Sequence, residues 1–255
     1  MKSIENNKMK ISTLSSSEEM KNRTEMLVLH DQNPIPEDEK INNTSLFLKR
    51  QELSKILFFN ELYQKVIKVH GIIIEFGCRW GQNLVTLNNL RGIHEPYNYN
   101  RKILGFDTFA GFNKTHDNDG NNDIIADGNF NVTKGYEDYL MKLLKNHETE
   151  SPLNHISKNI LIKGDAGEEL EKYLQNNPQT LIAFAWFDFD LYQPTLECLR
   201  LIKPYITKGT IIGFDELNDP KFPGETRALS EVFDLKDLNI TRNKFSGMQS
   251  YIEFN

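Results

Sequence analysis

Short apolar runs alternate with amphipathic segments between residues 71 and 214. The runs are rich in Ile, Leu, Phe and Ala and predict strands buried on both faces of a sheet, at 71–76, 102–106, 159–162, 181–187 and 210–214. Between them, apolar residues recur at helical spacing from about residue 81, and over 135–147, 167–175 and 194–202. This alternation predicts an α/β fold with a mostly parallel sheet that is covered by helices.

The two ends of the chain depart from this alternation. The runs 238–245 and 248–254 flank Ser246-Gly247 and predict a β-hairpin, so the sheet should end in an antiparallel pair. Residues 45–70 predict one or two helices packed on the sheet, at the start of a main domain that covers 45–255. Residues 1–44 are polar, and we expect them to be mobile or to form a lid, with a helical part from Ser17.

A long polar segment, residues 113–134, interrupts the strand and helix pattern. Asn, Asp, Gly and Thr dominate it. Loops of this length inside a compact domain are usually functional or disordered. We therefore interpret it as an insertion that serves as the substrate lid.

The first strand leads into a turn with the pattern E-x-G-x-x-x-G, formed by Glu75, Gly77 and Gly81. A strand, a glycine turn and a helix in succession bring backbone N–H groups close to a nucleotide-like ligand. The dinucleotide fingerprint G-x-G-x-x-G needs a further glycine where Arg79 stands. The turn therefore indicates a nucleotide-like ligand, with a nicotinamide dehydrogenase as a weaker alternative.

Every strand of the parallel set is followed by acidic residues, namely Glu75, Asp107, Asp165, Asp188 with Asp190, and Asp215 with Glu216. Ligands of such sheets bind at the carboxyl ends of the strands. Any one of these acids could be only a helix cap, but the set together favours a ligand site. Asp107 suits the two hydroxyls of a ribose, and a helix cap is its alternative role.

The acids after the fourth and fifth strands should converge, because those strands are expected to be neighbours. They are Asp188, Asp190, Asp215 and Glu216. Gathered carboxylates repel one another unless a cation or protons neutralise them. Oxygen ligands without His or Cys favour Mg²⁺ or a similar hard ion. A set of solvated strand-end acids is the alternative.

Composition narrows the class of protein. The chain has 255 residues, 38% hydrophobic and 26% charged, as in ordinary globular domains. Its net charge of −6 and the lack of a Lys/Arg-rich run argue against nucleic acid as a partner. Cys78 and Cys198 fall in apolar elements, as expected of reduced thiols. With no signal peptide and no apolar stretch of the ~20 residues that span a bilayer, we expect a cytoplasmic protein without a membrane partner.

Four blocks, in order, resemble the class I S-adenosylmethionine-dependent methyltransferases and, among them, the macrocin O-methyltransferase family, which modifies sugars in antibiotic and surface-glycan pathways. The blocks are GIIIEFGCRWGQN, ILGFDTFAGF, AWFDFDLYQPTLECL and GTIIGFDELNDPKFPGETRAL. The resemblance runs from about residue 45 to the C-terminus, and the final hairpin fits the family's last two strands. It implies a Rossmann-like, doubly wound sheet of seven strands, mostly parallel with an antiparallel C-terminal hairpin.

The resemblance also implies roles for individual residues. Its cofactor, S-adenosylmethionine, would lie against the residues at the first four strand ends, namely Glu75, Gly77, Cys78, Gly81, Asp107, Thr108, Asp165, Ala166 and Asp188. A divalent metal such as Mg²⁺ would be held by Asp188, Asp215 and Glu216. The family usually has a second Asp where this chain has Glu216. A His base that some relatives carry after the paired acids is missing here.

The implied reaction is a metal-dependent O-methylation of a sugar hydroxyl. The acceptor would be a sugar or sugar nucleotide, for example a nucleotide-linked or surface-polysaccharide sugar such as a heptose. Asp188 would bind the metal and accept the proton, with Asp190 as the second candidate for the base, and Tyr97, Tyr99 and Tyr192 could line the acceptor site. A phenol or catechol O-methyltransferase and a non-catalytic cofactor-binding domain are the alternatives, and a homo-oligomer is possible.

Overall fold

The computed structural model describes residues 15–113 and 115–255 of the chain. It falls into two compact units, Met1–Lys55 and Ile56–Asn255. The role expected for residues 1–44, a mobile segment or a lid, stays a prediction. Among the described residues, no helix has both the length and the apolar character needed to cross a membrane.

The described part of the N-terminal unit is helical. It contains α1 (Ser17–Asp31), the 3-10 helix η1 (Ile41–Phe47) and the start of α2 (Arg50–Val66). Ser16 caps α1, because its hydroxyl accepts from Glu19 N at 3.2 Å and the Glu19 carboxylate accepts from Ser16 N at 2.8 Å. None of the residues of α1 is buried, so local hydrogen bonds rather than a core hold this helix.

The second unit contains, among its described residues, a seven-stranded sheet in the order β3-β2-β1-β4-β5-β7-β6. The strands are β1 (Ile72–Phe76), β2 (Ile103–Asp107), β3 (Asn159–Lys163), β4 (Ile182–Phe187), β5 (Ile206–Phe214), β6 (Ile240–Arg242) and β7 (Ser250–Glu253). All pairs from β3 to β5 are parallel, and β7 pairs antiparallel with both β5 and β6. The predicted doubly wound sheet with a reversed C-terminal hairpin is confirmed.

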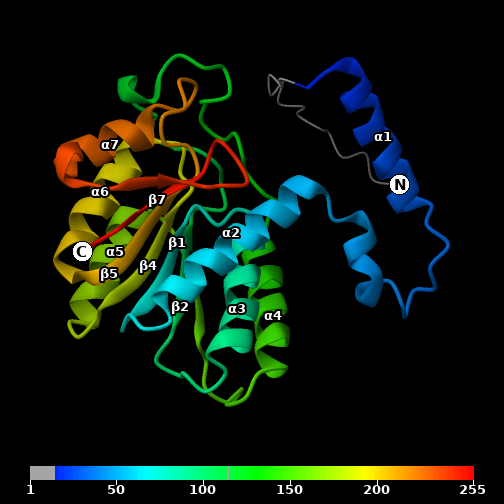
Figure 1. Cartoon of the computed structure of the whole chain (residues 1–255), viewed down its shortest axis with the longest axis horizontal. Coiled ribbons are helices and arrows are strands. Elements are labelled where there is room, and N and C mark those ends of the chain that lie inside the picture. The colour runs from blue at the N-terminus through cyan, green and yellow to red at the C-terminus, as the bar shows by residue number, and fades with distance from the viewer. Residues whose placement is uncertain (1–14, 114) are drawn as a thin grey trace. The chain divides into compact units, whose positions relative to one another are not determined.

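Helices cover both faces of this sheet (Figure 1). One face carries α2, α3 (Gln82–His94) and α4 (Tyr136–Thr149), and the other carries α5 (Ala166–Asn176), α6 (Tyr192–Ile202) and α7 (Gly224–Val232). Neighbouring residues of the central strands enter opposite cores: Trp186 packs under α2 and Phe187 under α6. The carboxyl ends of β1, β4 and β5 therefore stay fixed between two packed layers.

Three features of the fold differ from the sequence prediction. Helix α7 was not expected, because Pro220 and Pro223 precede it and mask its short apolar pattern. β5 begins earlier than expected, at Ile206. β6 is limited to Ile240–Arg242, and after it the chain is held by hydrogen bonds between the 243 and 249 positions rather than by a continued ladder.

The polar segment 113–134 contains one short 3-10 helix, η2 (Asp117–Asp119), among its described residues. Its two flanks are joined, since Phe112 N donates to Asn129 O and Gly128 N donates to Phe112 O, both at 2.8 Å. A surface loop whose ends are bonded together in this way is an Ω-loop, and we use this name for the described residues of 112–130. Whether it acts as a lid stays a prediction.

Candidate active site and metal-binding cluster

The glycine turn between β1 and α3 is packed too tightly for side chains. Gly77 has a φ of +84°, and a Cβ on it would lie 1.9 Å from the carbonyl oxygen of Asp188. Gly81 has a φ of +76°, and its Cβ would lie 2.3 Å from Leu140 Cδ1. Both positions therefore need glycine, and the turn that was predicted to hold the cofactor rests directly on the end of β4.

Asp107, at the end of β2, points its carboxylate at this turn. Its Oδ2 accepts from Arg79 N at 2.7 Å and its Oδ1 accepts from Phe109 N at 2.6 Å. Burial raises the pKa of Asp107, although these N–H groups oppose the shift. The backbone N–H of Cys78 also bonds this carboxylate, which leaves about one of its four lone-pair positions for a hydroxyl group of a ribose.

Glu75 and Cys78 are buried beside the same turn. Glu75 Oε1 accepts from Asn83 Nδ2 at 2.8 Å, which fixes the carboxylate at the start of α3. The Cys78 thiol lies 3.5 Å from Phe106 O, and burial raises its pKa, so it is a packing residue rather than a nucleophile. Asn83 was missed in the sequence, although it ends the first motif.

The remaining predicted cofactor residues have local structural roles in this structure. Thr108 Oγ1 donates to Gly111 O and accepts from Ala110 N, both at 3.1 Å. Asp165 caps α5, since its Oδ1 accepts from Glu168 N at 3.2 Å, and Ala166 is the buried first residue of that helix. The helix-cap alternative therefore holds for Asp165, and a contact with adenine stays a prediction.

Asp188, Asp215 and Glu216 come together as the sequence predicts. Each offers one carboxylate oxygen, and these oxygens lie within 4.8 Å of one another. The pairing of β4 with β5 causes this, because their last residues, Phe187 and Phe214, are register partners and the acids follow directly. Parallel neighbours that end at the same level bring their following residues to one place.

The electrostatics of this cluster favour either protonated carboxyls or a bound cation. Glu216 Oε2 is buried without a hydrogen-bond partner. Burial, followed by the nearby charge of Asp215, raises the pKa of Glu216 well above its usual range. A buried carboxylate beside other acids is costly unless protons or a metal ion balance the charge. The donor set, carboxylate oxygens alone, fits a hard divalent cation.

Asp190, the second candidate for the base, lies close to this cluster but outside the three-residue set. It is buried and has a φ of +61°, a left-handed conformation that a tight turn between β4 and α6 imposes. Its charge contributes to the raised pKa of both Glu216 and Glu225. Asp190 is therefore near enough to the acids to share their electrostatic environment.

Glu225, on α7, was missed as a functional residue. Its side chain is fully buried, Oε1 accepts from Phe189 N at 3.2 Å, and Oε2 accepts from Glu216 N at 3.3 Å. It therefore joins the backbone after β4 to the backbone after β5. Burial, followed by the charges of Asp190 and Asp188, raises the pKa of Glu225. The sequence could have indicated Glu225, because this acid directly follows Pro223-Gly224 in the fourth motif.

Gln249 also orients the cluster from the C-terminal hairpin. Its Nε2 donates to Asp215 Oδ1 at 3.1 Å, while its Oε1 accepts from Asn243 Nδ2 at 3.1 Å and from Ser246 Oγ at 2.5 Å. The amide is thus held at both ends and fixes one Asp215 oxygen. No sequence pattern links a hairpin glutamine to an acid 34 residues away.

Two of the tyrosines proposed for the acceptor site lie at the wrong edge of the sheet. Tyr97 and Tyr99 follow α3 and precede β2, which places them at the amino end of the parallel strands, and they are 72% and 52% exposed. Tyr192 begins α6, directly after the acids. Of the three, Tyr192 alone follows a carboxyl strand end, because the connections that enter parallel strands lie opposite those ends. Its ring packs in the core and its hydroxyl donates to Glu231 Oε1 at 2.6 Å, so a contact with the acceptor stays a prediction.

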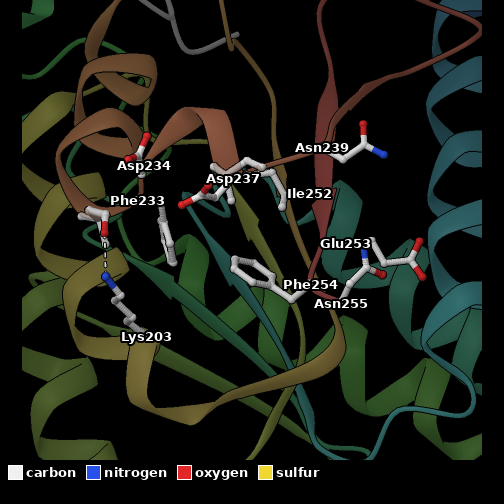
Figure 2. A pocket seen from close by; sticks show the side chains of 11 residues that line it. Lys203, Phe233, Asp234, Asp237, Asn239, Ile252, Glu253, Phe254 and Asn255 are labelled. Atoms are coloured by element: carbon white, nitrogen blue, oxygen red, sulfur yellow. Dashed lines mark hydrogen bonds between the residues drawn. The ribbon is translucent and has the colours of Figure 1, made fainter.

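A pocket of about 360 Å³ is formed by residues at or after the ends of α6, α7 and β7 (Figure 2). Its lining includes Lys203, Phe233 and Phe254. Lys203 Nζ donates to Val232 O at 2.7 Å, so its amine is already engaged. None of the residues predicted for the cofactor or the metal lines this pocket.

Comparison with known proteins gives matches among solved structures. No protein-family model and no curated protein sequence matches the chain. A crystal structure of CalS11, a calicheamicin methyltransferase, matches with a TM-score of 0.92 and 40% sequence identity over 95% of each chain. An apo structure of CalS11, described as a TDP-rhamnose 3'-O-methyltransferase, matches with a TM-score of 0.83 and 37% identity over 95% of this chain and 97% of that chain. The O-methyltransferase NovP shares the fold, with a TM-score of 0.58 at 16% identity over 79% of this chain and 80% of that chain.

Proposed function

Since this chain belongs to the S-adenosylmethionine-dependent sugar O-methyltransferases, we propose that it methylates a hydroxyl of a nucleotide-linked sugar with the help of a divalent cation such as Mg²⁺. The observation that carries the proposal is the 40% identity with CalS11 over 95% of both chains. TDP-rhamnose, the substrate named for that relative, is therefore the first acceptor to test, ahead of the heptose suggested by the sequence motifs.

The residues at the ends of β1 and β2 would hold the methyl donor. Asp107, whose carboxylate is fixed by backbone N–H groups, would accept from the ribose hydroxyls. Glu75 would lie at the methionine end, where its burial makes a cationic partner favourable. When bound, S-adenosylmethionine supplies an electrophilic methyl group, and the protein's part is to aim it at the acceptor oxygen.

Asp188, Asp215 and Glu216 would hold the cation, with Gln249 and Glu225 fixing the acids from behind. The unpartnered Glu216 oxygen and the raised pKa of that carboxyl support this assignment. A divalent cation at such a site lowers the pKa of a nearby acceptor hydroxyl.

The proton of the acceptor hydroxyl would pass to a carboxylate oxygen of Asp188 or Asp190. Both follow β4, on the side of the cofactor turn, because Gly77 packs against the Asp188 backbone. A positioned general base typically contributes 10²–10⁴-fold to the rate. The chain has Leu217-Asn218-Asp219 after the paired acids, where some relatives carry a His base. Asp188 or Asp190 would therefore be the general base here.

Calorimetry and an acceptor screen test the proposal together. We expect S-adenosylhomocysteine to bind, Mg²⁺ to bind independently, and methyl transfer to TDP-rhamnose to stop when EDTA is added. Free rhamnose and catechol serve as comparison acceptors. Absence of S-adenosylhomocysteine binding would refute the cofactor assignment, and equal turnover with catechol would refute the sugar-nucleotide assignment.

The stability of the metal-free protein should depend on pH through the acidic cluster. Glu216 and Glu225 have raised pKa values in the folded state, so the folded state binds more protons than the unfolded state. The free energy of unfolding should therefore fall as pH rises from the ordinary carboxyl range towards the raised values, by about 1.4 kcal/mol per pH unit for each carboxyl that stays protonated only in the folded protein. Saturating Mg²⁺ should restore stability most at the high end of this range.

Urea unfolding in EDTA at several pH values measures this effect. Other acids act in the opposite direction, for example Glu95, whose pKa is lowered, so the comparison is with Glu216→Gln. This variant should show a flatter profile and a smaller response to Mg²⁺. Parallel profiles for the two proteins would contradict the assignment of Glu216 to the cation site.

A further inference from the structure

The Ω-loop that follows β2 crosses the carboxyl edge of the sheet. At one end Phe130 lies under the guanidinium of Arg79, which belongs to the cofactor turn after β1, at 4.8 Å from the ring centre. At the other end the ring of His116 lies 4.9 Å from the ring of Tyr192, at the start of α6 after β4. The loop therefore contacts both the turn expected to hold the methyl donor and the helix that follows Asp188 and Asp190.

The segment 116–119 of this loop is docked on α6 and α7. Arg227 Nη1, on α7, donates to Asn118 Oδ1 at 2.9 Å. Gly224 begins α7, and a Cβ on it would lie 2.5 Å from Tyr192 N and 2.9 Å from Asp119 Oδ1. The carbonyl oxygen of Asp190 would also lie 2.9 Å from a Cβ on Gly224. The loop, α6 and α7 thus pack together next to the backbone of Asp190.

Asp119 links the loop to α6 by hydrogen bonds. Its side chain is fully buried, with Oδ1 accepting from Tyr192 N at 2.5 Å and Oδ2 accepting from His116 N at 2.6 Å. Leu191, the N-cap residue of α6, offers no side-chain acceptor, so Asp119, 73 positions before Tyr192, caps the helix instead. One carboxylate therefore fixes both the loop and the helix that follows Asp188 and Asp190.

The same contacts give His116 a defined orientation. His116 Nδ1 accepts from Asn118 N at 3.0 Å, so the proton of the neutral ring is on Nε2. The ring is exposed while its backbone and Nδ1 are held. The ring thus presents a hydrogen-bond donor beside Tyr192, the first residue of α6 after Asp188 and Asp190, whose own hydroxyl donates to Glu231 Oε1 at 2.6 Å.

We propose that His116 donates from Nε2 to an oxygen of the sugar-nucleotide acceptor, and that Asp119 is the positioning residue that holds His116 in place. The inference rests on the proposed function, and it assigns the acceptor side of the site to the Ω-loop. The oxygens of a sugar hydroxyl and of a diphosphate are both acceptors that fit an N–H donor.

Steady-state kinetics on three variants test the assignment. His116→Ala removes an exposed side chain, so the fold should survive, and we expect the KM for the nucleotide sugar to rise about tenfold with kcat within threefold. His116→Gln keeps an N–H donor of similar reach and should recover much of the loss. Asp119→Asn places an amide N–H against a backbone N–H, and it should raise KM like His116→Ala while the affinity for S-adenosylhomocysteine stays unchanged.

His155→Ala is the matched control, because His155 is also exposed but precedes β3, at the opposite edge of the sheet. It should leave both kinetic constants unchanged. A KM equal to that of the wild type in His116→Ala would overturn the role of His116. Weaker S-adenosylhomocysteine binding in Asp119→Asn would overturn the role of Asp119 as an acceptor-side residue. If the wild type transfers no methyl group to any nucleotide sugar, the proposed function itself fails.

Discussion

Asp188→Asn should lower kcat by about 10²–10⁴-fold or more, because one carboxylate is both a proposed metal ligand and a candidate base. The amide keeps the size of the side chain, so the packing of β4 should be preserved. Affinity for S-adenosylhomocysteine should stay within a few-fold of the wild-type value, and affinity for Mg²⁺ should fall. Single-turnover kinetics and calorimetry measure the two effects separately.

Asp237→Asn is the matched control for this variant. Asp237 is an exposed acid at the pocket in Figure 2, and none of the cluster acids lines that pocket. The substitution makes the same change in charge outside the acidic cluster. It should leave turnover and Mg²⁺ affinity unchanged. Unchanged turnover in Asp188→Asn would remove this residue from the mechanism, and Asp190→Asn would then be expected to carry the loss.

Gly77→Ala should cost both stability and activity. A side chain in the left-handed region costs about 1–2 kcal/mol by itself. Here the added Cβ would also lie 1.9 Å from the Asp188 carbonyl oxygen, so the backbone of β1 or β4 must move. Because Asp188 belongs to the acidic cluster, we expect a loss of unfolding free energy well beyond the strain alone, together with a large loss of turnover.

Gly135→Ala separates the cost of the left-handed backbone from the cost of the steric clash with Asp188. Gly135 has a φ of +78°, and nothing lies within 4 Å of its added Cβ. It should therefore show only the conformational cost. Urea unfolding of both variants gives the difference, which is the cost of the collision with Asp188. Equal losses of stability in Gly77→Ala and Gly135→Ala would show that the backbone at the end of β4 moves away without cost.

The sequence predicted the elements of the sheet well, because burial of a strand on both faces leaves a local signal in every apolar run. It also predicted the glycine turn and the meeting of Asp188, Asp215 and Glu216, since neighbouring parallel strands that end on acids must bring them to one edge. It did not predict α7, whose apolar pattern is short and follows a proline-rich stretch, and therefore it missed Glu225.

Contacts between distant segments had no such signal. Gln249 reaches Asp215 only because the hairpin returns beside β5, and Asp119 reaches Tyr192 only because the Ω-loop folds back over the sheet. The positions of Tyr97 and Tyr99 were likewise misjudged, since an aromatic residue in a loop carries no indication of which sheet edge it occupies.

The sequence by itself therefore determined the sheet, its two covering layers and the set of strand-end carboxylates, because periodicity and chain order fix which residues follow each strand. The tertiary structure decided which groups hold those carboxylates in place and where the Ω-loop docks. These contacts form between connections that are far apart in the chain. Their free energy is distributed over many interactions, so no local sequence pattern predicts them.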